Sequence, residues 1–214
     1  MPHEELEKIA ALAVKHDLFV FTDEIYSELL YDGRVHKSIV EYPGMRERTI
    51  LLHGFSKAFA MTGWRIGYIG APEIIAKACT KMQGQVTSGA NSIAQRATIT
   101  AVEADPSVLN EMVSAFKNRR DLVVALAQEI PGFKINIPEG AFYLFPDVSA
   151  YFGKTLRGKT INNADDFSMY LLSEANVATV TGDAFGNPNC IRLSYATSEA
   201  LLTEAFKRIA AALA

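Results

Sequence analysis

A short, almost wholly apolar segment directly after an amphipathic helix is the feature that most constrains the fold. Apolar residues recur at helical spacing from Leu6 to Val14, with charged side chains between them. The next segment, residues 18–22, reads Leu-Phe-Val-Phe-Thr and is apolar up to its last residue. Strands of this kind are typical of parallel sheets that helices cover on both faces. This part of the chain therefore predicts an α/β protein.

The same alternation continues along the chain. We expect strands at 49–55 and 66–71, followed by helices at 72–83, 92–103 and about 106–129. Beyond Pro131-Gly132 we expect short strands near 133–136, 142–145, 177–180 and 190–195, a loop at 153–160, a helix at 164–175, and a last helix capped by Ser198. Strands that alternate with helices favour α/β over all-β. The long helix near 104–130 predicts two domains, residues 1–104 and 105–214.

Charge and cysteine content exclude several classes of protein. The 214 residues include 21 Lys plus Arg and 24 Asp plus Glu, a formal net charge of −3. This balance predicts neither a nucleic-acid partner nor binding to an anionic membrane, and no apolar run approaches the ~20 residues of a membrane span. Cys79 and Cys190 stand far apart without a CxxC spacing, so we predict no metal site and a reduced, cytoplasmic setting.

The strongest local motif is the run from His53 to Gly67, which follows the second expected strand. It presents Lys57 from a loop that contains Gly and Ser, and Arg65 follows after Thr-Gly. A Lys at a strand end in apolar surroundings can act as an amine nucleophile, and an Arg matches phosphate oxygens with its fork of donors. The alternative interpretation is a surface Lys and a structural Arg, which occurs about as often.

Two further segments offer polar groups. Asp23 ends the first expected strand, where α/β proteins tend to bind ligands, and Tyr26 follows it. The alternative is a capping carboxylate beside a packing tyrosine. Arg192 lies in the strand expected at 190–195, where it could bind a carboxylate through two hydrogen bonds or simply face solvent.

Taken in order, these motifs resemble those of the fold-type-I aminotransferases that use pyridoxal phosphate. The matching residues are Asp23-x-x-Tyr26, then Ser56-Lys57 with Arg65-Ile-Gly67, then Arg192-Leu-Ser-Tyr195. The run Ser-Lys-Ala-Phe-Ala-Met-Thr-Gly-Trp-Arg-Ile-Gly-Tyr is similar to the branch that includes bacterial aspartate aminotransferases, and 138–143 and 181–186 match the small-domain pattern. The resemblance covers essentially the whole chain. It implies part of a large cofactor-binding domain with a mainly parallel sheet, followed by a C-terminal α/β small domain.

The resemblance assigns five side chains to the cofactor. Lys57 would bind pyridoxal phosphate covalently and then move the substrate proton. Asp23 would keep the pyridine nitrogen protonated, and Tyr26 would hydrogen-bond the phenolic oxygen. Arg65 would bind the phosphate, with Ser56 as a second donor.

The resemblance assigns the substrate to the second half of the chain. Arg192 would bind the substrate α-carboxylate, and Phe185 would line the pocket. Gly54 stands where many relatives carry a Ser, so that side chain is missing here. Asn91 lies in a loop that could face a neighbouring subunit, although it brings no positive charge and a helix N-cap is the favoured interpretation.

The function that the resemblance implies is ping-pong transfer of an amino group from an amino acid, aspartate first, to a 2-oxoacid, by a homodimer. Because family members carry much more sequence ahead of these motifs, we expect this chain to be the C-terminal piece of a longer enzyme. Such a piece would leave an open sheet edge and exposed apolar surface, and would bind cofactor weakly by itself. The alternatives are a non-catalytic association module, or another pyridoxal-phosphate reaction such as β-elimination or carbon–carbon condensation.

Overall fold

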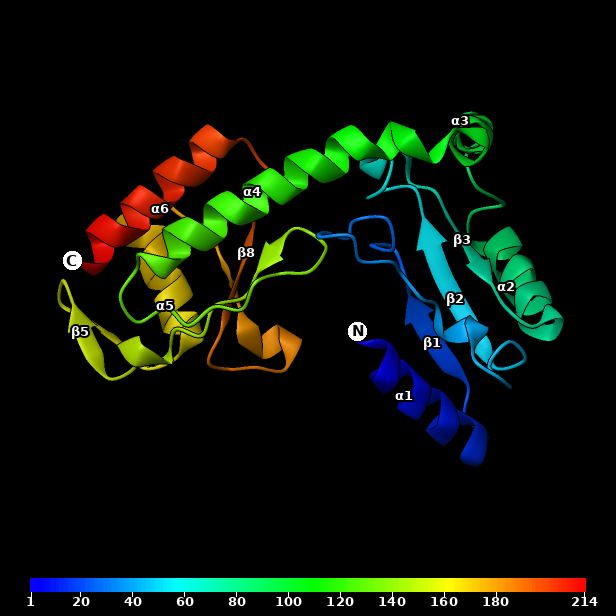
Figure 1. Cartoon of the computed structure of the whole chain (residues 1–214), viewed down its shortest axis with the longest axis horizontal. Helices are drawn as coiled ribbons and strands as arrows, with labels where there is room; N and C mark the ends of the chain where they lie inside the picture. The colour runs from blue at the N-terminus through cyan, green and yellow to red at the C-terminus, as the bar shows by residue number, and fades with distance from the viewer. The chain divides into compact units, whose positions relative to one another are not determined.

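The computed structural model describes all 214 residues, which form two compact units, residues 1–110 and 111–214 (Figure 1). Each unit combines helices with strands, so the expected α/β class is confirmed. No helix has both the length and the hydropathy that crossing a membrane requires.

The first unit is built around a three-stranded sheet in the order β1-β2-β3. Its strands are β1 (Val20–Asp23), β2 (Thr49–Gly54) and β3 (Gly67–Gly70). Its helices are α1 (His3–Lys15), α2 (Glu73–Val86) and α3 (Ser92–Glu103), with 3₁₀ turns η1 (Ile39–Glu41), η2 (Thr62–Trp64) and η3 (Pro106–Leu109). These helices and strands lie where the periodicity predicts them, to within a few residues.

The sheet is mixed rather than mainly parallel. Strands β1 and β2 are parallel, with Asp23 opposite Leu52, as their apolar sequences predict. Strand β3 instead runs antiparallel to β2, with Gly54 opposite Gly67. A parallel partner would need a long crossover, usually a helix, whereas residues 55–66 hold only turns. The C-terminal end of β2 therefore meets the start of β3, with the Lys57 turn between them.

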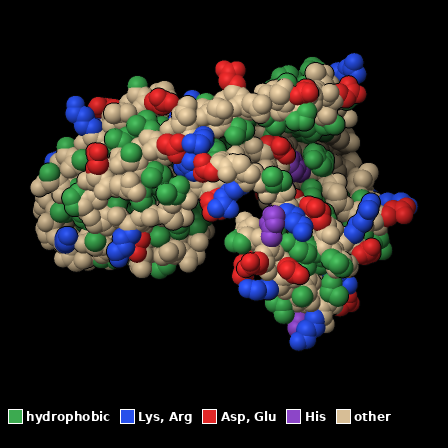
Figure 2. All heavy atoms as spheres, in the orientation of Figure 1, with side chains coloured by type: hydrophobic (Ala, Val, Ile, Leu, Met, Phe, Trp, Pro, Cys, Tyr) green, Lys and Arg blue, Asp and Glu red, His purple; other side chains and the backbone are tan.

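One buried cluster of the first unit lies between α1 and η1. It consists of Ala10, Ala13, Ile39 and Met45, with Leu6, Val20 and Tyr42 packed against them. Further buried apolar side chains of this unit are Leu29, Tyr31, Ile50, Phe55, Ala58, Met61 and Ala94. Helix α2 buries none of its residues. Apolar side chains on α2 and α3 are exposed instead, with Ile74 78%, Val86 71%, Ile93 70% and Val102 70% accessible. Figure 2 shows apolar side chains at the surface of this unit.

The second unit combines three α-helices and a π-helical turn with short strands. Its helices are α4 (Asn110–Gln128), α5 (Ala164–Tyr170), η5 (Leu171–Ala175) and α6 (Glu199–Leu213), with 3₁₀ turns η4 (Ser149–Tyr151) and η6 (Gly182–Phe185). Its strands are β4 (Tyr143–Leu144), β7 (Val180–Thr181) and β8 (Ile191–Ser194), ordered β4-β8-β7, and the separate pair β5 (Lys154–Leu156) and β6 (Lys159–Ile161). Both pairings of β8 are antiparallel.

Two sequence predictions for this unit are wrong. The strand expected at 133–136 is only a single bridge between Lys134 and Asp147. The loop expected at 153–160 is a hairpin, in which β5 and β6 pair across Arg157 and Gly158. Both turn residues have positive φ, 48° and 80°, as a two-residue hairpin turn requires. The strands flanking that turn are only three residues each, too short to show a clear alternation.

Candidate functional site

Asp23 lies where the sequence predicts, at the C-terminal end of β1. The Glu24 N–H donates to the Leu52 carbonyl at 3.0 Å, so the pairing with β2 continues one residue past the strand. The exposed Asp23 side chain accepts the Ile25 N–H on Oδ1 at 3.1 Å. Asp23 therefore caps its own turn, as the alternative interpretation expects, and its carboxylate still borders a pocket.

Lys57 lies in the turn that follows β2. The Phe59 N–H donates to the Phe55 carbonyl at 3.1 Å and closes this turn, which half buries Lys57. The Lys57 Nζ lies 5.8 Å from the centre of the Tyr26 ring. Two residues that the resemblance assigns to one cofactor are thus neighbours, although 31 positions separate them in the chain.

A pocket of about 320 Å³ joins three more of the predicted residues. Asp23, Ser56 and Arg65 all line it, together with Ile25, Leu52, His53, Gly54, Ile66 and Gly67. Arg65 is exposed, has a left-handed backbone with φ of 53°, and donates through Nη1 to the Thr62 carbonyl at 2.9 Å. The pocket thus offers a carboxylate that can accept from a basic nitrogen, and a hydroxyl and a guanidinium that can donate to an anionic group.

Two glycines at the wall of this pocket allow β2 and β3 to approach closely. Gly54 and Gly67 face each other across β2 and β3. A Cβ on Gly67 would lie 2.8 Å from the His53 carbonyl oxygen, and one on Gly54 would lie 3.2 Å from the Gly67 Cα. Larger side chains would therefore push the two strands apart at the wall of the pocket.

A larger open cavity of about 1330 Å³ lies along β3, α2 and the loop before α3. His53 and Arg65 line both cavities. His53 stacks on Tyr68 with ring centres 5.5 Å apart. Partial burial, and after it the negative charges of Glu28 and Glu24, raise the pKa of Tyr68, so its hydroxyl remains protonated. At the far end, the Asn91 side chain accepts the Ala94 N–H at 3.0 Å, which confirms its interpretation as a helix N-cap.

In the second unit, the Arg192 guanidinium contacts two aromatic rings. Its guanidinium carbon is 4.5 Å from the centre of the Tyr143 ring and 4.2 Å from that of Phe185. Phe185 in turn makes an edge contact with Phe145, at 6.1 Å between ring centres. Aromatic rings packed against a guanidinium limit its movement and leave N–H groups that can donate in its own plane. This geometry suits two parallel hydrogen bonds to a carboxylate.

The segment that carries Tyr143 is anchored by a buried charge. Arg120 of α4 is only 3% exposed, and its Nη1 donates to the Pro138 carbonyl at 3.0 Å. Asp121 accepts its Nε at 2.6 Å. Tyr195 also stabilises this segment, because its hydroxyl donates to the Ala141 carbonyl at 3.2 Å. These contacts explain why the Pro138–Tyr143 motif can present a ring to Arg192.

Sequence reasoning missed two contributors. Tyr143 belongs to a motif that the resemblance matches, yet its contact with Arg192 follows only from the pairing of β4 with β8. Glu24 follows Asp23 directly, but it is buried, only 8% exposed, rather than solvated. A charged residue after a strand end normally faces water, so the sequence held no signal for this burial.

Comparison with known proteins gives a consistent result. The family model for aminotransferase class I and II matches residues 1–209. A bifunctional aspartate aminotransferase and glutamate/aspartate-prephenate aminotransferase of Petunia hybrida is 48% identical over 99% of this chain and 45% of its own length. An aspartate aminotransferase of Bacillus subtilis is 42% identical over 96% of this chain and 52% of its own length.

Solved structures agree with these relatives. The aspartate aminotransferase of Rhizobium meliloti superposes with a TM-score of 0.91 at 42% identity, covering 96% of this chain and 52% of that protein. An aromatic aminotransferase of Pyrococcus horikoshii also reaches 0.91, at 38% identity, covering all of this chain and 56% of that protein. The chain spans about half the length of the curated relatives it matches.

Proposed function

The chain belongs to the class I and II aminotransferase family, and from that premise we propose that it carries the cofactor-holding residues of a pyridoxal-phosphate-dependent aminotransferase. The observation that carries the proposal is the pocket shared by Asp23, Ser56 and Arg65, beside the neighbouring pair Lys57 and Tyr26. Activity, substrates and partners belong to the proposal, because the chain spans about half of its relatives.

The pocket residues fit this cofactor in type. Asp23 offers a carboxylate that would hold a proton on the pyridine nitrogen, while Arg65 and Ser56 offer donors for the phosphate. Tyr26 would donate to the phenolic oxygen. Gly54 and Gly67 let β2 and β3 approach closely at the wall of this pocket.

Pyridoxal phosphate, when bound, supplies a cationic ring that withdraws electrons from the substrate Cα. Lys57 would hold the cofactor through Nζ, and the same amine, once released, would take the proton from Cα and return it to the cofactor side. The Lys57 turn suits this task because it half buries the amine without enclosing it. Arg192, in contact with the rings of Tyr143 and Phe185, would orient the substrate through its α-carboxylate.

Aspartate is the proposed amino donor, and a 2-oxoacid the acceptor. Support comes from the names of the Petunia, Bacillus and Rhizobium relatives. The aromatic aminotransferase among the similar structures makes an aromatic donor the alternative to test. By the same family likeness we extend the proposal to a homodimer in the cytoplasm. The two cysteines are free, as a reducing setting allows.

The test is a titration of the chain with pyridoxal phosphate, followed by visible absorbance. A saturable band that disappears in Lys57→Ala supports the proposal. Lys154→Ala is the matched control, since the Lys154 Nζ also lies over a tyrosine ring, 5.2 Å from the centre of Tyr151. An equal band in wild type and Lys57→Ala would contradict it, and no binding at all would favour a non-catalytic association module.

Product analysis separates the reactions that this cofactor supports. The chain, or a longer protein that contains it, is incubated with aspartate and 2-oxoglutarate. Formation of glutamate and oxaloacetate identifies amino transfer. Loss of aspartate without glutamate would point to another reaction on the same fold, and turnover of phenylalanine in place of aspartate would identify an aromatic donor.

A further inference from the structure

Glu24 is the one buried carboxylate of the chain, and the roles proposed above do not use it. Only 8% of the residue is exposed. It follows Asp23 directly and precedes Tyr26 by two positions. A charge out of contact with water is costly unless hydrogen-bond donors surround it, so its partners indicate what it holds in place.

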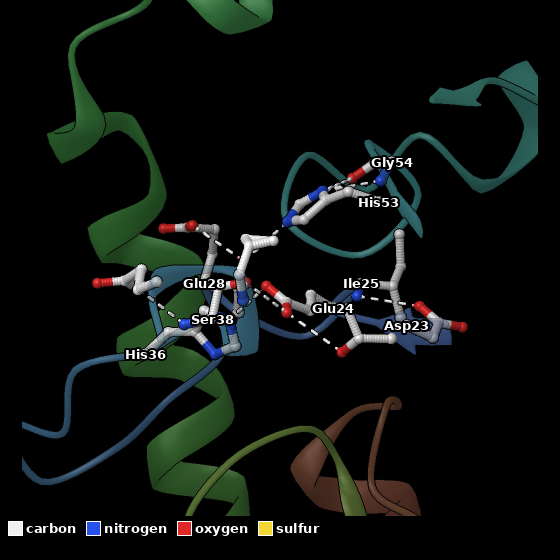
Figure 3. Close-up of polar contacts among 12 residues, drawn as sticks. Asp23, Glu24, Ile25, Glu28, His36, Ser38, His53 and Gly54 are labelled. Atoms are coloured by element: carbon white, nitrogen blue, oxygen red, sulfur yellow. Dashed lines mark hydrogen bonds and ion pairs between the residues drawn. The ribbon is translucent and has the colours of Figure 1, made fainter. Parts of the chain in front are cut away.

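Three side chains donate to this carboxylate (Figure 3). Oε1 accepts the Ser38 hydroxyl at 2.8 Å and the Thr22 hydroxyl at 3.2 Å. Oε2 lies 2.7 Å from the His36 Nε2. Thr22 belongs to β1, whereas His36 and Ser38 come from the loop that enters η1. The carboxylate therefore ties this loop to the end of the strand.

Backbone hydrogen bonds connect Glu24 to the residues on either side of it. The Glu24 carbonyl accepts the Ser27 N–H at 2.9 Å, and the Tyr26 carbonyl accepts the Leu29 N–H at 3.0 Å. Two consecutive turns thus follow the strand, and Tyr26 projects from the first. Asp23, on the other side of Glu24, is fixed by the Ile25 N–H. A shift of Glu24 would move Asp23 and Tyr26 together.

A second contact secures the same turn from β2. The Ser27 hydroxyl lies 2.8 Å from the His53 Nε2, and His53 lines the pocket that Asp23 borders. The His53 Nδ1 accepts the Gly54 N–H at 2.8 Å, which ties the ring to the end of β2. Tyr26 therefore lies between two residues, Glu24 and Ser27, whose side chains are both hydrogen-bonded to other parts of the first unit.

We propose that Glu24, with His36 and Ser38 as its donors, is a positioning residue that holds the Asp23 carboxylate and the Tyr26 hydroxyl in place for the cofactor. The assignment rests on the proposed function. Glu24 itself does not line the pocket, so it acts through the segment from Asp23 to Tyr26. A loop residue that bonds only to solvent could not fix two neighbours in this way.

Two measurements on Glu24→Gln test this role. The first is amide hydrogen exchange at Ser27 and Leu29, whose N–H groups close the two turns. We expect exchange about tenfold faster there, because a hydrogen bond to a charged group contributes on this order to keeping a segment closed. The second is the pyridoxal-phosphate titration, in which we expect affinity to fall about three- to tenfold while Lys57 is still labelled.

Glu28→Gln is the matched control. Glu28 is an exposed carboxylate in the same segment, and it accepts the Ser27 hydroxyl at 3.1 Å. We expect this control to leave exchange and affinity near wild type. If Glu24→Gln does not fold, His36→Ala removes one donor at a side chain that is 35% exposed, and the same result is expected to a smaller extent.

The outcomes separate the two proposals. Unchanged exchange at Ser27 and Leu29, or an equal acceleration throughout the first unit including Met45, would leave Glu24 an ordinary structural residue and overturn the role. Faster local exchange with unchanged cofactor affinity would overturn it as well. If the wild-type chain shows no band that depends on Lys57, the proposed function fails and the positioning role falls with it.

Discussion

Replacing Phe185 with Leu removes one of the two rings that contact the Arg192 guanidinium and keeps an apolar side chain. Phe185 is exposed, makes an edge contact with Phe145, and has its ring centre 4.2 Å from the guanidinium carbon. A cation–π contact at a partly exposed site contributes about 0.5–1 kcal/mol. Phe185→Leu should therefore destabilise the second unit by about that amount, with a further small loss from reduced burial.

A double-mutant cycle with Arg192→Met isolates this contact. Arg192→Met loses the contacts with both rings, so about 1–2 kcal/mol is expected. With Phe185→Leu in the background, only the Tyr143 contact remains to be lost, at 4.5 Å. The coupling energy between the two positions should then be about 0.5–1 kcal/mol.

The assay is urea unfolding of the four proteins, followed by circular dichroism and by amide exchange in β8. The single Trp, Trp64, lies in the first unit, and its fluorescence serves as an internal control that should not change. A coupling energy below about 0.3 kcal/mol, the usual error of such cycles, would refute the reasoning. The rings would then be neighbours of Arg192 that do not hold it.

Three further perturbations follow from the same geometry. Gly67→Ala places a Cβ 2.8 Å from the His53 carbonyl, so thermal unfolding should show a loss of about 1–3 kcal/mol; an unchanged melting temperature would mean that the strands separate freely there. Asn91→Ala removes the cap of α3 and should cost about 1 kcal/mol, visible as faster amide exchange in the first turn of that helix and nowhere else. The Ser149 hydroxyl and N–H lower the pKa of Asp147. The stability that Asp147 contributes is therefore complete above the ordinary pKa of 3.8 and is lost as the pH falls through the lowered pKa. Asp147→Asn should reduce this loss of stability at acid pH in unfolding experiments, and an identical pH dependence in both proteins would disprove the assignment.

Much of the first unit could be predicted because its signals are local. The apolar strand at 18–22 and the helical spacing of Leu6 to Val14 each need only neighbouring residues, and both lie where they were expected. Strand direction is not local. Strand β3 pairs antiparallel because the connection at 55–66 is too short for a crossover, a fact that depends on which strand becomes its neighbour.

The candidate site divides in the same way. Ordered motifs predict Asp23, Lys57 and Arg65 as candidates, and Asp23 and Arg65 line the same pocket. The burial of Glu24 could not be predicted, because its donors His36 and Ser38 lie 12 and 14 positions further along a loop without periodicity. The same holds for Tyr143, whose approach to Arg192 requires the pairing of two strands that are far apart in the chain.

The central claim is that Lys57 is the lysine that holds pyridoxal phosphate beside Asp23 and Arg65. The most direct measurement is mass spectrometry of peptides after the chain is incubated with the cofactor and reduced with borohydride. Attachment of one pyridoxyl phosphate to the peptide that contains Lys57, lowered by Arg65→Ala and absent in Lys57→Ala, is the predicted result. Equal labelling of lysines across the chain, or labelling that spares Lys57, would contradict it.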